Sequence, residues 1–222
     1  MKTEMVEFKI WGTEKYVLVT DRIDDEAAYR FKNVRLNKIA TKSFTTFDDN
    51  GRHYSLHQCI WDYVPYFKQI KAEIEECGIA VPGFGKYLFL KESKQVWNKE
   101  TNHFSDIKED GLVTMLRNNK RHSLTFNQLV YMTEKNVKYE EGFAYIDCTL
   151  EGNLFVEDAN MIVRMTRSIW GSIRQQRATF ERKLADHDIK NTIDWFFDKM
   201  DLLDLELPEI EKIQLGIIDK YL

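Results

Sequence analysis

The stretch from Met161 to Leu184 constrains the fold more than any other, because it predicts one long helix with two different faces. At about 100° per residue, apolar residues form a stripe along one side of this helix. The stripe consists of Ile162, Met165, Ile169, Ile173, Phe180 and Leu184. An adjacent arc carries Arg164, Arg167, Arg174, Arg177 and Arg182, with Trp170 beside them. Such a helix buries its apolar stripe and needs negative groups opposite its arginines.

This arginine arc predicts a partner-binding surface. Guanidinium groups held this close together repel one another unless negative groups face them. The negative groups belong to this chain, to a partner subunit or to nucleic acid, and the sequence leaves these three alternatives open.

The composition favours a folded chain with a substantial core. The chain has 222 residues, of which 43% are hydrophobic and 31% are charged, so a disordered chain is excluded. It has 10 Gly and 3 Pro, which is few for a barrel or sandwich that must turn many times. The length suits one domain, or one domain with an appended helical segment.

Local patterns predict an α+β fold built from antiparallel hairpins and packed helices. The predicted strand pairs are 7–11 with 15–20, 43–47 with 52–54, 86–90 with 95–97, and 143–150 with 154–156. Asp24 to Phe31 predicts a short helix. Asn98 to Arg121 carries no readable pattern.

Helix boundaries give clearer signals than the strands. Ser55 and Gln58 have the spacing of a capping box, and Pro65 either kinks the helix that follows or begins a second one. Gly78 predicts the end of that region, and Thr125 predicts the cap of a further short helix.

From Glu157 onward the patterns predict helices only. The arginine helix comes first, followed by helices over 189–203 and 208–222. We therefore expect a mixed body at 1–156 and a three-helix segment at 157–222 that packs on this body. Between Glu157 and Ala185 six Lys or Arg stand against three acids, a net charge of +3, whereas 186–222 has ten acids against four Lys, a net charge of −6.

The cysteines and the hydropathy pattern indicate a reducing compartment and no membrane partner. Cys59, Cys77 and Cys148 have no C-x-x-C spacing, which is typical of thiols in a reducing compartment. No run approaches the roughly 18 apolar residues that a spanning helix needs. We expect a protein of the cytoplasm or of a virion.

No catalytic residues, metal or cofactor are predicted. His53, His57 and Cys59 form an H-x3-H-x-C grouping, but a zinc site needs further ligands, and Cys59 is better explained as a core residue. Glu92 and Lys94 form an E-x-K pair that a metal-dependent nuclease uses, and a charged turn explains this pair more simply. The chain has neither a G-x-S-x-G elbow nor a phosphate-binding glycine loop.

A second basic cluster adds a nucleic-acid alternative. Arg117, Lys120 and Arg121 lie close together in sequence, next to His122, and arginine suits phosphate through bidentate contacts. The net charge of the whole chain is −4, which counts against general attraction to nucleic acid.

The expected function is that of a non-enzymatic structural or adaptor subunit in a multi-chain assembly. Arginine and aromatic residues are enriched in interfaces, and 13% of this chain is aromatic. The adjoining basic and acidic segments suit head-to-tail contact between copies, as in a homo-oligomeric ring. A phage virion component such as a head-tail connector fits this description. The alternatives are a nucleic-acid-binding regulator that uses the arginine helix, and a metal-dependent nuclease.

Overall fold

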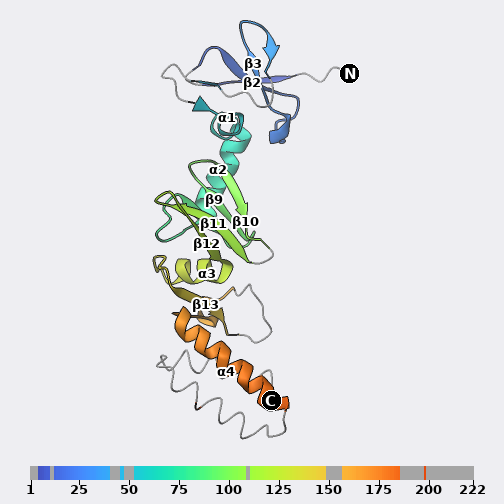
Figure 1. The fold of residues 1–222 in the computed structure, drawn as a ribbon. Coiled ribbons are helices and arrows are strands. Elements are labelled where there is room, and N and C mark those ends of the chain that lie inside the picture. The colour runs from blue at the N-terminus through green and yellow to red at the C-terminus, as the bar shows by residue number, and fades with distance from the viewer. Residues whose placement is uncertain are drawn as a thin grey trace. The chain divides into compact units, whose positions relative to one another are not determined.

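The computed structural model describes residues 5–10, 13–40, 46–47, 53–108, 111–148, 157–185 and 198. These residues form an α+β fold whose strands pair antiparallel (Figure 1). The chain divides into two compact units: unit 1 comprises 1–79 and 86–105, and unit 2 comprises 80–85 and 106–222. The expected boundary at 156 does not coincide with this division.

The strands of the first half are short. They are β1 Val6–Lys9, β2 Tyr16–Thr20, β3 Arg30–Asn33, β4 Lys38–Ile39, β5 Thr46–Phe47, β6 His53–Tyr54, β7 Ile79–Ala80, β8 Tyr87–Leu90, β9 Gln95–Asn98 and β10 His103–Asp106. Four of them form a sheet in the order β1-β2-β3-β4, and four more form a sheet in the order β10-β9-β8-β7. The predicted pairs β1 with β2, β5 with β6, and β8 with β9 are confirmed.

Two helices and a short 3-10 turn complete the first half of the chain. They are η1 Glu26–Ala28, α1 Leu56–Tyr63 and α2 Pro65–Cys77. The Ser55 hydroxyl accepts the Gln58 N–H at 3.1 Å, and the Gln58 side chain accepts the Ser55 N–H at 3.1 Å, so the predicted capping box is confirmed. Pro65 begins α2, and Gly78 ends it. The predicted helix at 24–31 is only η1, because β3 begins at Arg30.

The core of unit 1 joins the sheet β1-β2-β3-β4 to α1, α2 and the β8–β9 pair. Its buried members are Ile10, Leu18, Tyr29, Phe31, Cys59, Ile60, Trp61, Val64, Phe67, Ile74, Leu88 and Trp97. Trp61 packs against two other aromatic rings of this core. Its ring centroid is 4.8 Å from that of Trp97 and 5.3 Å from that of Phe67. Large aromatic rings therefore supply much of the buried apolar surface of this small unit.

The described part of unit 2 is built around two strand pairs and two helices (Figure 1). Its elements are β11 Leu112–Arg117, β12 Lys120–Thr125, α3 Phe126–Glu134, β13 Phe143–Asp147, η2 Ala159–Met161, β14 Ile162–Thr166 and α4 Arg167–Ala185. The Thr125 cap of α3 is confirmed, since its hydroxyl accepts the Gln128 N–H at 3.1 Å. Helix α3 packs against β12, β13 and η2, and α4 packs against β13 and β14.

The single helix predicted over 161–184 is wrong in its first turn and a half. Ile162 to Thr166 form β14, which pairs with β13, and the helix starts only at Arg167. The residues before and after 156 thus share one strand pair. The strand predicted at 154–156 lies outside the described residues, as do the helices predicted at 189–203 and 208–222 apart from Asp198.

Candidate functional site

Arg164 does not belong to the arginine arc. It lies on β14, and its guanidinium carbon is 3.9 Å from the centroid of the Phe143 ring. The same guanidinium forms an ion pair with Glu140. Its charge is therefore met within the chain, and the placement of Arg164 on a helix is wrong, while its role in binding a partner stays a prediction.

The remaining arginines lie on α4, whose start is held firmly. The Ile169 N–H donates to the Thr166 hydroxyl at 3.3 Å, and the Arg167 N–H donates to the Gly142 carbonyl at 2.9 Å. Ile173 is fully buried, so this side of α4 packs on the unit. The arginine face is defined here as Arg167, Arg174, Arg177 and Arg182, with the half-buried Trp170 beside them.

The arginine face has no negative partner among the described residues. Arg167, Arg174 and Arg182 are exposed, and Arg177 is half-buried. Arg182 donates only locally, to the Ala178 carbonyl at 3.4 Å and to the Thr179 hydroxyl at 3.2 Å. Among the carboxylates whose side chains the structure describes, none lies within ion-pair distance of these four guanidinium groups.

The second basic cluster is divided between the two faces of the β11–β12 hairpin. Arg117 is directly opposite Lys120, and Met115 is opposite His122, so Arg117, Lys120 and His122 share one face. Arg121 lies opposite Leu116 and points to the other face. Asn118 and Asn119 form the turn with φ of 49° and 60°, the left-handed pair of a tight hairpin.

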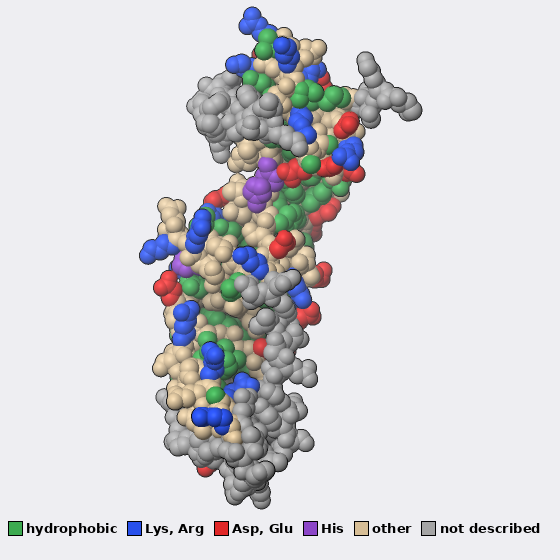
Figure 2. Space-filling model, turned by 45° about the vertical axis from the view of Figure 1, so that its right-hand side comes forward, with side chains coloured by type: hydrophobic (Ala, Val, Ile, Leu, Met, Phe, Trp, Pro, Cys, Tyr) green, Lys and Arg blue, Asp and Glu red, His purple; other side chains and the backbone are tan. Residues whose placement is uncertain are grey.

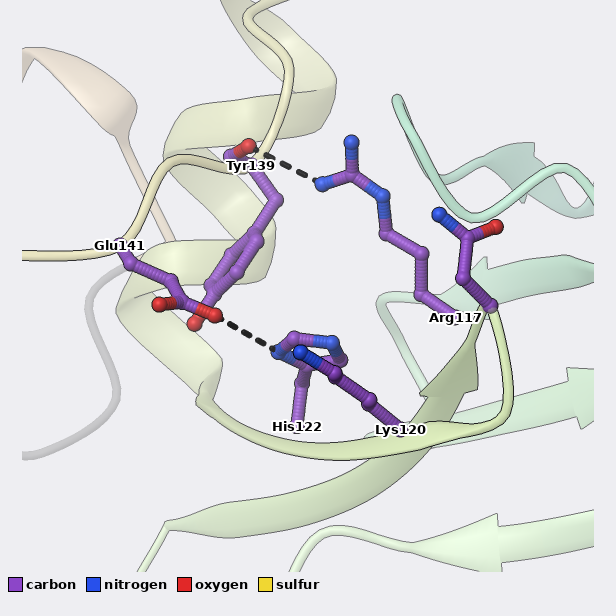
Figure 3. Close-up of a pocket in the computed structure, with 6 residues that line it drawn as sticks. Arg117, Lys120, His122, Tyr139 and Glu141 are labelled. Carbon is purple, nitrogen blue, oxygen red and sulfur yellow. Dashed lines mark hydrogen bonds and ion pairs between the residues drawn. The ribbon is translucent and has the colours of Figure 1, made fainter.

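Arg117 and Lys120 line an open pocket of about 400 Å³ (Figure 3). Its other lining residues are Asn118, His122, Tyr139 and Glu141. The Arg117 guanidinium donates to the Tyr139 carbonyl at 3.2 Å, and His122 Nδ1 is 3.8 Å from a Glu141 oxygen. Sequence reasoning named the two cations, but it missed Tyr139 and Glu141, which follow the next helix.

An aromatic cluster supports one side of this pocket. The ring centroid of His122 is 5.1 Å from that of Tyr139 and 5.8 Å from that of the buried Phe84. Phe84 comes from the loop 82–85, where Gly83 has a φ of +83°. The positive φ would strain any other side chain at Gly83, and a Cβ there would be in van der Waals contact with an Arg117 nitrogen at 3.8 Å. The loop 82–85 therefore also shapes this pocket.

Unit 1 contains a second polar cluster, centred on His57. Its Nδ1 contacts a Glu26 carboxylate oxygen, and its Nε2 is 2.7 Å from the Asn102 carbonyl. The Trp61 indole N–H donates to the other Glu26 oxygen at 3.2 Å. Both partners of the His57 ring accept hydrogen bonds, so the ring donates from both nitrogens as an imidazolium.

The pKa values in this cluster follow from burial and from the pairing of the two charges. Burial alone would lower the pKa of His57, but the hydrogen bonds to Glu26 and to the Asn102 carbonyl outweigh it, and the pKa is raised. Burial alone would raise the pKa of Glu26, yet the hydrogen bond and charge of His57 leave it lowered. Each group therefore holds the other in its charged form.

His103 stacks on His57, with ring centroids 3.8 Å apart and an interplanar angle of 5°. Burial and the positive charge of His57 lower the pKa of His103. Figure 2 shows histidine side chains reaching the surface beside acidic side chains. Since both nitrogens of His57 are engaged, this cluster is arranged to hold segments together rather than to move protons.

The other candidate residues from the sequence lie in the core or in turns where their side chains are described. Cys59 is a core residue, as expected, and burial raises its pKa to about 12. Glu92 and Lys94 lie in the tight β8–β9 turn, as the simpler interpretation predicted. The side chain of His53 lies outside the described set. Within the described residues, no group of three or more His, Cys, Asp or Glu is placed to hold a metal ion.

No helix in the described part of the chain has the length and apolar character needed to span a membrane. Comparisons with family models, with curated proteins and with solved structures gave no match for this chain. The residues of the site are therefore the basis for any functional assignment.

Proposed function

We propose that this protein is a non-enzymatic structural or adaptor subunit of a multi-chain assembly. The observation that carries this proposal is the arginine face of α4, which meets no carboxylate among the described residues. By contrast, Arg164 is stacked and paired within its own unit. Arg164 is thus paired within its own unit, whereas the arginine face has no such partner among the side chains that the structure describes.

The physical chemistry of the arginine face suits a protein interface. A guanidinium is weakly hydrated and binds carboxylates through two parallel hydrogen bonds. Trp170 lies beside these arginines and is half-buried, so it offers an apolar anchor. Arginine and tryptophan are the side chains most often found among the residues that dominate binding energy at interfaces.

The finer form of this proposal is a ring of identical copies, such as a head-tail connector of a phage virion. The net charge of +3 on 157–185 adjoins the net charge of −6 on 186–222. If the basic segment of one copy meets the acidic segment of the next, the contact is head-to-tail, and such contacts form a ring where the rotation between copies closes.

Native mass measurement of the purified full-length chain, with identification of co-purifying chains, tests this proposal. We expect an oligomer or a defined complex, and we expect its mass to fall as salt rises, because exposed ion pairs are screened. A chain that stays monomeric at low salt and brings no partner would count against an assembly role.

A nucleic-acid-binding regulator is the second candidate, and it is favoured by the same arginines, which meet no carboxylate among the described side chains. If Arg167, Arg174 and Arg177 contact phosphates, the protein binds all nucleic-acid sequences alike. Each contact then releases counterions from the nucleic acid. Alanine at these positions is then expected to weaken binding and to flatten its salt dependence. If the protein is not retained on DNA or RNA at about 50 mM salt, where such contacts are strong, this candidate is excluded.

A further inference from the structure

The pocket at the end of the β11–β12 hairpin has an excess of positive charge that the fold does not explain. Arg117 and Lys120 face each other directly across the strand pair, and like charges in this position are destabilising. Glu141 is the acidic residue of the pocket, and it lies nearest to His122. An anion between the two cations would remove this repulsion.

Both cations have N–H groups that can bind such an anion. Among the described residues, the Lys120 ammonium has neither a hydrogen-bond nor an ion-pair partner. The Arg117 guanidinium gives one N–H to the Tyr139 carbonyl, and this bond fixes its direction (Figure 3). Its remaining N–H groups can bind a phosphate oxygen in the bidentate way that guanidinium groups favour.

The size of the pocket and its aromatic side indicate a ligand larger than a simple anion. A volume of about 400 Å³ lies within the range of small-molecule sites, whereas a phosphate ion alone would leave most of it empty. The Tyr139 ring stands on the side opposite Arg117 and is half-buried against Phe84 and His122 (Figure 3). A ring held in this way offers a rigid surface for a base to stack on.

We propose that this pocket binds a nucleotide. The phosphate lies between Arg117 and Lys120, and the base packs against Tyr139. Asn118 also lines the pocket, and its amide both donates and accepts hydrogen bonds. The nucleotide is either free in solution or part of a single strand, because both present the same phosphate and base.

Calorimetric titration of the full chain tests this inference with four probes. They are adenosine monophosphate, ribose 5-phosphate, inorganic phosphate and a short single-stranded oligonucleotide. We expect adenosine monophosphate to bind more tightly than ribose 5-phosphate, and ribose 5-phosphate at least as tightly as inorganic phosphate. An oligonucleotide that binds more tightly than the monophosphate identifies a strand as the source, and the reverse order identifies a free nucleotide.

Substitutions locate the binding. Lys120→Ala is expected to weaken binding of adenosine monophosphate roughly tenfold, the effect of losing one hydrogen bond to a charged group. Arg121→Ala is the matched control, because this exposed cation is the next residue along β12 and points to the opposite face. It is expected to change the affinity by less than about twofold.

Tyr139 tests the position of the base. Tyr139→Phe keeps the ring and is expected to retain the affinity for adenosine monophosphate. Tyr139→Leu is expected to lower the affinity for adenosine monophosphate and to leave the affinity for inorganic phosphate unchanged. The inference is overturned if none of the probes binds at millimolar concentration, or if Arg121→Ala weakens binding as much as Lys120→Ala. Equal affinity for inorganic phosphate and adenosine monophosphate would overturn the placement of the base. Because the pocket residues are separate from the arginine face, these results do not depend on the assembly role.

Discussion

His57 shows how one side chain can hold three separate segments of unit 1. Its ring links Glu26 of η1 and the Asn102 carbonyl, which precedes β10, to its own helix α1. Asn102 adopts a φ of 54° at this turn, and its carbonyl lies 2.7 Å from His57 Nε2. Local order in this unit therefore depends on a charged pair as well as on its aromatic core.

This pair predicts a bell-shaped pH dependence of stability. The raised pKa of His57 contributes stability that is full below its ordinary value of 6.5 and is lost as the pH rises through the raised value. The lowered pKa of Glu26 contributes stability that is full above its ordinary value of 4.5 and is lost as the pH falls through the lowered value. The contribution of the pair is therefore largest between pH 4.5 and 6.5.

The measurement is urea unfolding of the wild type and of His57→Gln, followed by tryptophan fluorescence from about pH 4 to about pH 9. In the favourable window we expect His57→Gln to cost about 1–2 kcal/mol, a modest value because Glu26 is partly screened by water. The difference should shrink at high pH. A difference that is independent of pH would show that the pair contributes through packing alone.

Arg164 and Arg167 form a matched comparison in unit 2, because they lie three residues apart and differ in environment. Arg164→Ala is expected to cost about 1–3 kcal/mol, since it removes the contact with Phe143 and leaves Glu140 without its partner. Arg167→Ala is expected to change the free energy of unfolding by less than about 0.5 kcal/mol, as is usual at an exposed position. Chemical denaturation measures both, and equal costs would contradict the distinction drawn here.

At the scale of elements, local signals predicted capped helix starts and several hairpins between neighbouring strands, and they missed a strand whose partner is distant in sequence. The Ser55 capping box, Pro65 at the start of α2 and the Thr125 cap depend on residues three or fewer positions away. The strand β14 was missed because Ile162 and Met165 also fit a helical period. Its partner β13 is distant in sequence, so no local window contains the pairing that makes it a strand.

In the candidate sites, too, local signals indicated single residues but not which residues the fold brings together. The sequence indicated Arg117 and Lys120, but only the register of β11 and β12 shows that they face each other while Arg121 turns away. Tyr139 follows α3 in sequence and reaches the same pocket only through the tertiary fold. Asn118 and Asn119 are a local turn signal that the interpretation of 98–121 as unreadable missed, because asparagine adopts positive φ more readily than other non-glycine residues.

That turn yields a prediction at the scale of the hairpin. Asn119 has a φ of 60°, so Asn119→Gly is expected to be neutral or to stabilise the chain by up to about 1 kcal/mol. Asn119→Val is expected to destabilise it by about 1–2 kcal/mol, because a β-branched residue at positive φ is strained. Thermal unfolding compares the two variants. Equal melting temperatures would contradict the assigned turn.

At the scale of the whole molecule, the distribution of charge matters more than its sum. A net charge of −4 gives no general attraction to polyanions, yet the arginine face is positive and the segment after it is strongly acidic. Charge separated in this way favours oriented contact between chains, and it predicts an assembly that depends on salt and on the arginines of α4.

Native mass spectrometry of two double variants tests the role of the arginine face most directly. The test variant combines Arg167→Ala and Arg174→Ala, which removes two exposed charges from α4. The control variant combines Arg35→Ala and Arg121→Ala, which removes two exposed arginines from hairpins elsewhere. We expect the α4 pair to shift the assembly to smaller masses and the control pair to leave the wild-type mass unchanged. If both double variants keep the mass of the wild-type complex, the arginine face is not the contact that holds the assembly together.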